Sequence, residues 1–203
     1  MRCIVDKNAI VVKGNNIRNI SSWIDFEEIP LKDISELKKY YSQEFIDAYN
    51  FAKKYWITTT TSIWDAKMYS TLTRIEMAEM LSNFAINLLW KKPDISKWMV
   101  KFDDVTNKLN LEYGNAVTLS YQLGIMWQNI KSNRFRPNDE VTRAEFVTVL
   151  SRLLYRIEDW NWKMKYYEPH ILKLYNEWII NKINPNLKEK KWYVILMLTR
   201  SIQ

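Results

Sequence analysis

A four-residue pattern, Thr-Arg-x-Glu, occurs twice in the chain and brings together side chains suited to binding an anion. It occupies residues 73–76 and 142–145, each time directly before an apolar run at helical spacing. The planar guanidinium of arginine matches a carboxylate with two parallel hydrogen bonds. Arg74 and Arg143 are therefore candidates for binding a carboxylate-bearing partner.

The threonine and glutamate of each pattern have a structural explanation as well. Thr-x-x-Glu before an apolar helix is a capping box, in which the two side chains bind the first backbone amides of the helix. Capping does not explain the arginines, because a cation at a helix N-terminus lies against the positive end of the dipole. Two explanations stay open for them, a bound anionic ligand and an internal ion pair. The carboxylates considered for such a pair are Asp103, Asp104 and Glu28.

Enzymatic chemistry finds little support in the residue types. The chain has one histidine, His170, and one cysteine, Cys3, which argues against a Ser-His-Asp triad, a metal site and an internal disulfide. Asp103 and Asp104 form an adjacent acidic pair, but neighbours in an extended segment point apart, which suits a glycosidase poorly. We therefore predict no enzyme, no catalytic residue, no cofactor and no metal. His170 is interpreted as capping or packing a helix that starts after Pro169.

Composition narrows the class of protein. The 203 residues are 47% hydrophobic, enough for one sizeable domain or two small ones. A formal net charge of +7 favours an anionic partner, which could be nucleic acid, a membrane surface or an acidic polysaccharide. No stretch approaches the roughly 18 apolar residues of a membrane span. Residues 1–14 lack the apolar run of a secretory signal, so a protein working outside the cell would be represented here by a fragment.

The Thr-Arg-x-Glu pattern lies inside a longer unit that recurs along the chain. In the clearest copy, residues 102–105 lead into a helix over 115–123, which Gly124-Ile125 ends because glycine accepts the left-handed conformation. A turn at 135–139 follows, and residues 141–146 open a second helix that runs to 154. The first copy begins at 26–29, has a helix over 42–55, stops at 56–57 and opens its second helix at 72–77.

The third copy is degenerate. A helix over 170–177 stops at 178–179, and a last helix covers 194–200, but Lys191 stands where the arginine belongs. The resulting division is an N-terminal extension or end of an upstream domain, then three repeats at 26–89, 100–155 and 164–203. The extension covers residues 1–25 and is expected to hold a short hairpin of 4–5 with 9–12; residues 86–101 and 156–165 are expected to be linkers.

These motifs resemble the S-layer homology repeat, whose pattern is a Phe-x-Asp-Val start, a Leu-Gly-Ile stop, a Phe-x-Pro turn and Ile-Thr-Arg-Ala-Glu-Phe. The resemblance covers about residues 26–203 and is strongest in the second copy. It implies a mainly α fold of three helix-loop-helix repeats around a pseudo-threefold axis, with a short extended segment at the N-terminus. It also implies a non-catalytic module at the cell surface, part of a larger protein, that binds a cell-wall polysaccharide such as one bearing pyruvate ketals.

Carried over residue by residue, the family's binding motif falls on both Thr-Arg-x-Glu patterns, with an acid of the repeat start and the third-copy lysine added. The predicted ligand-binding residues are Thr73, Arg74, Glu76, Thr142, Arg143, Glu145, Asp104 and Lys191. The alternative function is a basic helical interaction or nucleic-acid-binding domain, which the charge and the aromatic residues favour. No base-reading motif accompanies it, so nucleic acid is not the expected partner.

Ten tryptophans and three glycines are an unusual balance, since average usage predicts roughly 14 glycines in a chain of this length. Trp56 and Trp178 take the helix-stop place that Gly124 holds in the second copy. We hypothesise that the gene comes from a bacterium that reads UGA as glycine, and that UGA is translated here as tryptophan. The alternative is genuine tryptophans that stack on sugar rings. Because they fall on stops and turns, none is nominated as a ligand contact. The further tryptophans at turns or small-residue positions are Trp127, Trp160, Trp162 and Trp192.

Overall fold

The computed structural model describes residues 10–13, 16–19, 36–97, 101–126, 133–155 and 164–202. This part of the chain is mainly helical, as predicted, and a two-stranded antiparallel hairpin precedes the helices. None of its helices is long and apolar enough to cross a membrane. The elements are β1 (Ile10–Lys13), β2 (Asn16–Asn19), α2 (Gln43–Lys54), α3 (Arg74–Asn87), α4 (Asn107–Glu112), α5 (Ala116–Gln122), α6 (Arg143–Tyr155), α7 (Glu168–Asn176) and α8 (Lys191–Arg200).

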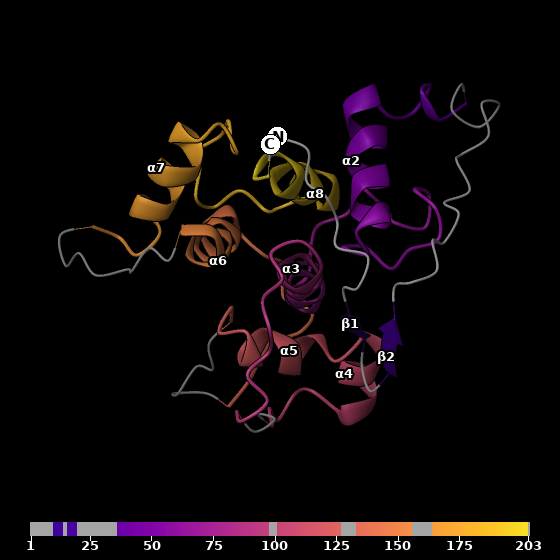
Figure 1. Cartoon of the computed structure of the whole chain (residues 1–203). Helices are drawn as coiled ribbons and strands as arrows, with labels where there is room; N and C mark the ends of the chain where they lie inside the picture. The colour runs from indigo at the N-terminus through magenta and orange to yellow at the C-terminus, as the bar shows by residue number, and fades with distance from the viewer. Residues whose placement is uncertain are drawn as a thin grey trace.

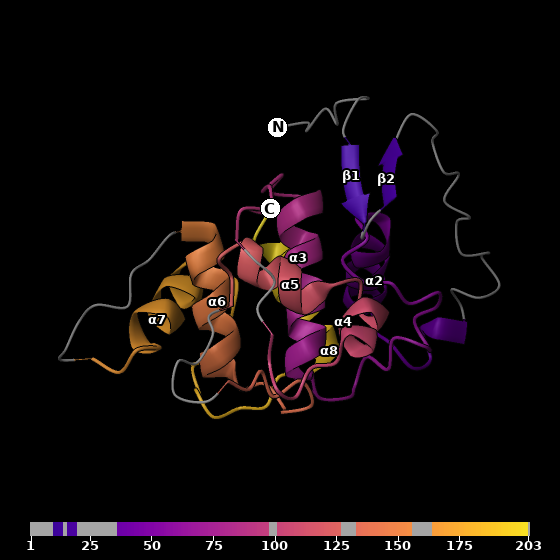
Figure 2. The same ribbon diagram turned by 90° about the horizontal axis from the view of Figure 1, so that it is seen from below.

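Three helices, α3, α6 and α8, lie in the middle of the molecule, with α2, α7 and the α4–α5 pair outside them (Figure 1). Each outer helix packs against the central helix of the preceding repeat: α5 on α3, α7 on α6, and α2 on α8. The last of these contacts joins the first repeat to the third. Figure 2 shows the same grouping from below, with α5 alongside α3 and α7 alongside α6. A single apolar core therefore draws side chains from all three predicted repeats.

The segments that enter the central helices pair with one another in a closed cycle. Leu72 N donates to Glu189 O at 2.8 Å, Glu189 N to Val141 O at 2.9 Å, and Val141 N to Leu72 O at 2.9 Å. Antiparallel bridges flank these bonds between each pair of segments. The segment of the degenerate third copy makes the same backbone hydrogen bonds as the segments of the other two copies. It supports the pseudo-threefold arrangement, which stays a prediction.

Three helices end with the same backbone geometry at the predicted stops. Trp56, Gly124 and Trp178 have φ of 56°, 69° and 58°, in the left-handed region. The isoleucine after each stop donates its amide to the carbonyl five residues back, at 2.8–3.0 Å, and its side chain is buried. This is the bonding of a glycine-terminated helix. The three stops at 56–57, 124–125 and 178–179 are therefore confirmed.

Helix α4 is not predicted from the sequence. Its apolar residues, Leu109 and Leu111, are two positions apart and mark no helical face. Thr106 caps the helix by accepting from Leu109 N at 3.1 Å. Asn110 is buried and ties α4 to α5 by accepting from Val117 N at 3.0 Å. Polar contacts thus hold this helix together with the packing of Leu109 against the core.

Other boundaries shift for identifiable reasons. Helix α8 begins at Lys191 rather than at 194, because its first amides find carbonyl partners in the 68–70 loop. Helix α3 extends to Asn87, which lies in the predicted linker. Strand β1 pairs with β2, whereas the predicted partner of residues 9–12, residues 4–5, lies outside the described residues. The first-repeat start at 26–29 and the tryptophans at 127, 160 and 162 also lie outside them.

His170 joins α7 to α6 and gives the fold a testable pH dependence. The side chain is fully buried, with Nδ1 3.2 Å from Ser151 Oγ. Burial, helped by the charge of Arg152, lowers the pKa of His170 from 6.5 to about 4. The unfolded chain therefore binds a proton at a higher pH than the folded chain, so the free energy of unfolding falls as the pH drops from 6.5 towards 4.

We expect this one histidine to account for a loss of up to roughly 3 kcal/mol over that range. Urea denaturation of the natural chain and of His170→Gln at several pH values isolates the contribution, because the carboxylates titrate alike in both. The variant should lose less stability on acidification. Identical pH profiles would show that His170 is not the titrating group.

Candidate ligand-binding site

The two Thr-Arg-x-Glu patterns cap α3 and α6 as predicted. Glu76 Oε2 accepts from Thr73 N at 2.9 Å, and Glu145 Oε2 accepts from Thr142 N at the same distance. The Thr142 hydroxyl completes its capping box by accepting from Glu145 N at 3.3 Å. These four side chains thus have a structural task. Whether they also contact a ligand stays a prediction.

The cation of each pattern is the first residue of a central helix and stands at a junction between repeats. Arg74 N donates to Asp139 O at 2.9 Å, Arg143 N to Leu187 O at 2.7 Å, and Lys191 N to Ser70 O at 3.1 Å. In each case the carbonyl belongs to the next segment of the cycle. Arg74, Arg143 and Lys191 are therefore equivalent positions at three junctions, which makes their side chains directly comparable.

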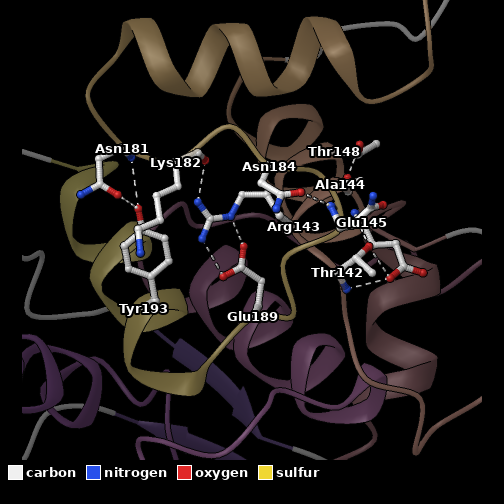
Figure 3. A network of polar contacts seen from close by, with 11 residues as sticks. Thr142, Arg143, Ala144, Glu145, Thr148, Asn181, Lys182, Asn184, Glu189 and Tyr193 are labelled. Atoms are coloured by element: carbon white, nitrogen blue, oxygen red, sulfur yellow. Dashed lines mark hydrogen bonds and ion pairs between the residues drawn. The ribbon is translucent and has the colours of Figure 1, made fainter.

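The Arg143 junction is closed by the protein itself. The guanidinium forms a two-pronged ion pair with the Glu189 carboxylate through Nε and Nη2, the latter at 3.1 Å, and Nη1 donates to Lys182 O at 2.7 Å (Figure 3). Its plane lies over Tyr193, 4.5 Å from the ring centroid. Arg143 is 0% exposed and Glu189 1% exposed. All three nitrogens of this guanidinium have a hydrogen-bond partner.

For Arg143, the internal ion pair is the explanation that the structure supports. Its partner is Glu189, which is not one of the three predicted acids. Asp104 instead accepts from the amides of Phe135 and Arg136 at 2.8 and 2.9 Å, and so fixes the turn that precedes α6. Asp103 accepts from the side-chain amide of Asn133 at 3.0 Å. Burial raises the pKa of Glu189, and the neighbouring Arg143 opposes that rise.

Lys191 also has an internal partner. Its ammonium forms an ion pair with Glu76 Oε1 at 2.5 Å, between the third repeat and the cap of α3. The two side chains are 14% and 19% exposed, so the pair is largely removed from solvent. The sequence predicted both residues as ligand contacts. The structure brings them together, and they neutralise each other.

Arg74 differs from both. Within the part of the chain that the structure describes, no carboxylate oxygen lies within 4.0 Å of its guanidinium, and its buried Nε has no hydrogen-bond partner. The guanidinium carbon is 5.3 Å from the centroid of the Phe135 ring. Burial lowers the pKa of Arg74, with Arg136 adding to the effect and Glu145 and Asp139 opposing it. A desolvated, unpaired donor of this kind is costly unless something binds it.

The three cations have different partners because the next entering segment carries a different residue at the equivalent position. Arg143 meets Glu189 of the next segment, and the equivalent residue beside Arg74 is Val141, a buried hydrocarbon. Beside Lys191 it is Leu72, also buried. Glu189 was not predicted as the partner of Arg143, because it belongs to the degenerate repeat. The available signal was one acid at a position that is apolar in the other two copies.

A comparison with known families agrees with the motif. Residues 101–147 match the family described as the S-layer homology domain. This segment contains α4, α5, the turn at 135–139 and the Thr-Arg-x-Glu pattern of α6. Over this segment the chain therefore resembles the S-layer homology domain, a family of non-catalytic modules that generally anchor proteins at the cell wall. The number of repeats stays a prediction. No curated protein matches the chain.

The buried pair makes a prediction about stability. Removing the charge of Glu189 leaves Arg143 buried and uncompensated, so we expect Glu189→Gln to lower the free energy of unfolding by roughly 3–5 kcal/mol. The double variant Arg143→Met, Glu189→Leu removes both charges and should be much less destabilised than the sum of the single variants. Urea denaturation measures all three.

The exposed pair of Lys173 and Glu177, with Nζ and Oε1 2.6 Å apart, provides the control. Glu177→Gln should change the free energy of unfolding by no more than about 1 kcal/mol. If Glu189→Gln were equally mild, the pair would not be holding the third repeat to the second.

Proposed function

We propose that this chain holds its protein at the bacterial cell surface by binding an anionic cell-wall polysaccharide, and that Arg74 is the principal ligand contact. The observation that carries the proposal is the Arg74 Nε, which is buried without a partner. A carboxylate placed against Nε and one Nη would satisfy it and cancel the buried charge. A polymer bearing pyruvate ketals supplies such carboxylates at regular intervals.

The Arg143–Glu189 pair supports this assignment. At the equivalent junction, the same residue type already binds a carboxylate through the same nitrogens. Arg74 has the aromatic face of Phe135 on one side, as Arg143 has that of Tyr193. The chemistry proposed for a ligand at Arg74 is therefore chemistry that this chain performs internally with its own side chain.

The charges that act on Arg74 are mixed, with Glu145 and Asp139 opposing Arg136, so the attraction of an acidic polymer comes from the chain as a whole. Arg136 lies close enough to oppose the charge of Arg74, and its side chain is 52% exposed. Asp139 partly balances Arg136, with Nη1 and Oδ2 3.5 Å apart. The chain as a whole carries a net charge of +7. Binding should accordingly weaken as salt increases, because the approach of an acidic polymer to this surface is screened.

The remaining predicted contacts support the site rather than form it. The two threonines and Glu145 cap helices, Glu76 pairs with Lys191, and Asp104 holds the turn that carries Phe135 and Arg136. Through that turn Asp104 positions the aromatic face against which Arg74 lies. We assign Arg143 a structural part, because its guanidinium is already bound by Glu189.

A pull-down with purified cell-wall glycan tests the proposal, with immobilised DNA as the competing ligand. The natural chain should be retained on glycan and not on DNA. Arg74→Gln should weaken retention by at least about tenfold, the loss expected for a charge-assisted, two-pronged contact. Lys108→Gln removes one equally charged, exposed side chain on α4 and should leave retention nearly unchanged.

Circular dichroism of each variant checks that the fold is intact. Retention on DNA alone would refute the anchoring function and favour a nucleic-acid-binding domain. Equal losses for the two variants would mean that overall charge, rather than the Arg74 site, drives binding.

A further inference from the structure

The three junctions of the cycle are built alike but are not equally available to a ligand. Each has a cation at the start of a central helix and, opposite it, one residue of the next entering segment. The opposing residues are Val141, Glu189 and Leu72 for Arg74, Arg143 and Lys191 respectively. We infer that Glu189 permanently occupies the second junction, so that the described chain offers one open carboxylate site, at Arg74. This inference rests on the proposed function.

Displacing Glu189 is unfavourable for a ligand on two grounds. The carboxylate is part of the chain, so its effective concentration at Arg143 exceeds that of any free competitor at ordinary concentration. Both members of the pair are excluded from solvent, at 0% and 1% exposure, so a ligand has no approach to the guanidinium. Arg74, in contrast, is only partly buried as a whole residue, although its Nε is buried. Lys182 O also takes the remaining nitrogen. An exchange would have to open the contact between two repeats.

The third junction is also filled, in a different way. Lys191 has no acid opposite it, but its ammonium reaches back to Glu76. A lysine is a point charge and cannot offer the two parallel donors that a carboxylate receives from arginine. A ligand there would also have to compete with a largely buried ion pair. Of the three equivalent cations, Arg74 alone combines the two-pronged geometry with an unsatisfied donor.

A titration with a monovalent probe tests this inference. The probe is a methyl glycoside carrying one pyruvate ketal, and isothermal titration calorimetry gives its stoichiometry and dissociation constant. We expect one probe per chain. Arg74→Gln should raise the dissociation constant at least about tenfold, whereas Arg143→Met, Glu189→Leu should leave it within about twofold, because the two sites share no partner.

Two or three probes per chain, or loss of binding in a folded Arg143→Met, Glu189→Leu variant, would overturn the inference. Failure of the unsubstituted chain to bind the probe would also overturn it. The anchoring function is decided separately by retention on glycan, so a chain retained on glycan but binding several probes refutes the single open site and keeps the anchoring role.

An independent observation concerns the backbone at three tryptophans. Trp56, Trp90 and Trp178 have φ of 56°, 51° and 58°, a conformation that costs a bulky L-residue roughly 1–2 kcal/mol and glycine almost nothing. Their side chains are 42%, 63% and 85% exposed, so packing returns little of that cost. At the equivalent helix stop of the second repeat the residue is Gly124, with φ 69°.

We propose that these three positions are glycine in the protein that the source bacterium makes, because that bacterium reads UGA as glycine. Ten tryptophans and three glycines together approach the roughly 14 glycines expected of this length. The functional consequence is that the native surface lacks these exposed indoles. Sugar stacking on these three side chains then plays no part in ligand binding.

The gene and one pair of variants test this proposal. The codons at 56, 90 and 178 should be UGA, and UGG at these positions would refute it. Trp178→Gly should lower the equilibrium constant for unfolding by roughly five- to thirtyfold. Trp64→Gly is the control, because Trp64 is 48% exposed and its φ is not positive. A Trp178 variant no more stable than the Trp64 variant would show that no strain is relieved.

Discussion

Three backbone hydrogen bonds, linking Leu72, Val141 and Glu189 in a cycle, are the constraint on which the rest of the structure depends. They close the first predicted repeat onto the third and place the starts of α3, α6 and α8 next to one another. Each outer helix then packs on the central helix of a neighbouring repeat. The three predicted repeats share one apolar core, which is the general behaviour of repeat architectures. The three ligand-site candidates are a by-product of this closure.

The cycle also determines how much free energy it costs to bury each of the three cations. A buried guanidinium is expensive unless a carboxylate and further acceptors satisfy it. Arg143 receives both from the third predicted repeat, whereas the segment beside Arg74 has Val141 at the position of Glu189, and Arg74 keeps an unsatisfied nitrogen. Lys191 has no acid at the equivalent position and forms an ion pair with Glu76, the carboxylate that caps α3. One side-chain difference at one position of the cycle thus separates a structural arginine from the arginine that we propose binds the ligand.

Local patterns predicted what local physics determines. Apolar spacing located the main helices, Gly-Ile and its counterparts located their ends, and Thr-x-x-Glu located the caps of α3 and α6. Helix α4 was missed because side-chain hydrogen bonds from Thr106 and Asn110 hold it. The distinction between Arg74 and Arg143 was also out of reach. Their immediate sequences are nearly the same, and the partner that separates them is 46 residues further along the chain from Arg143.

The proposed site has one arginine and can still support anchoring. Much of the desolvation and side-chain ordering that ligand binding requires has already taken place when the chain folds. The Arg74 Nε has already lost its water, so a carboxylate that binds there does not have to remove it. The guanidinium is held by the start of α3 and by the Phe135 ring, so little side-chain freedom is lost on binding. The affinity of the site then depends chiefly on whether the ligand presents a carboxylate in the orientation that Glu189 presents to Arg143.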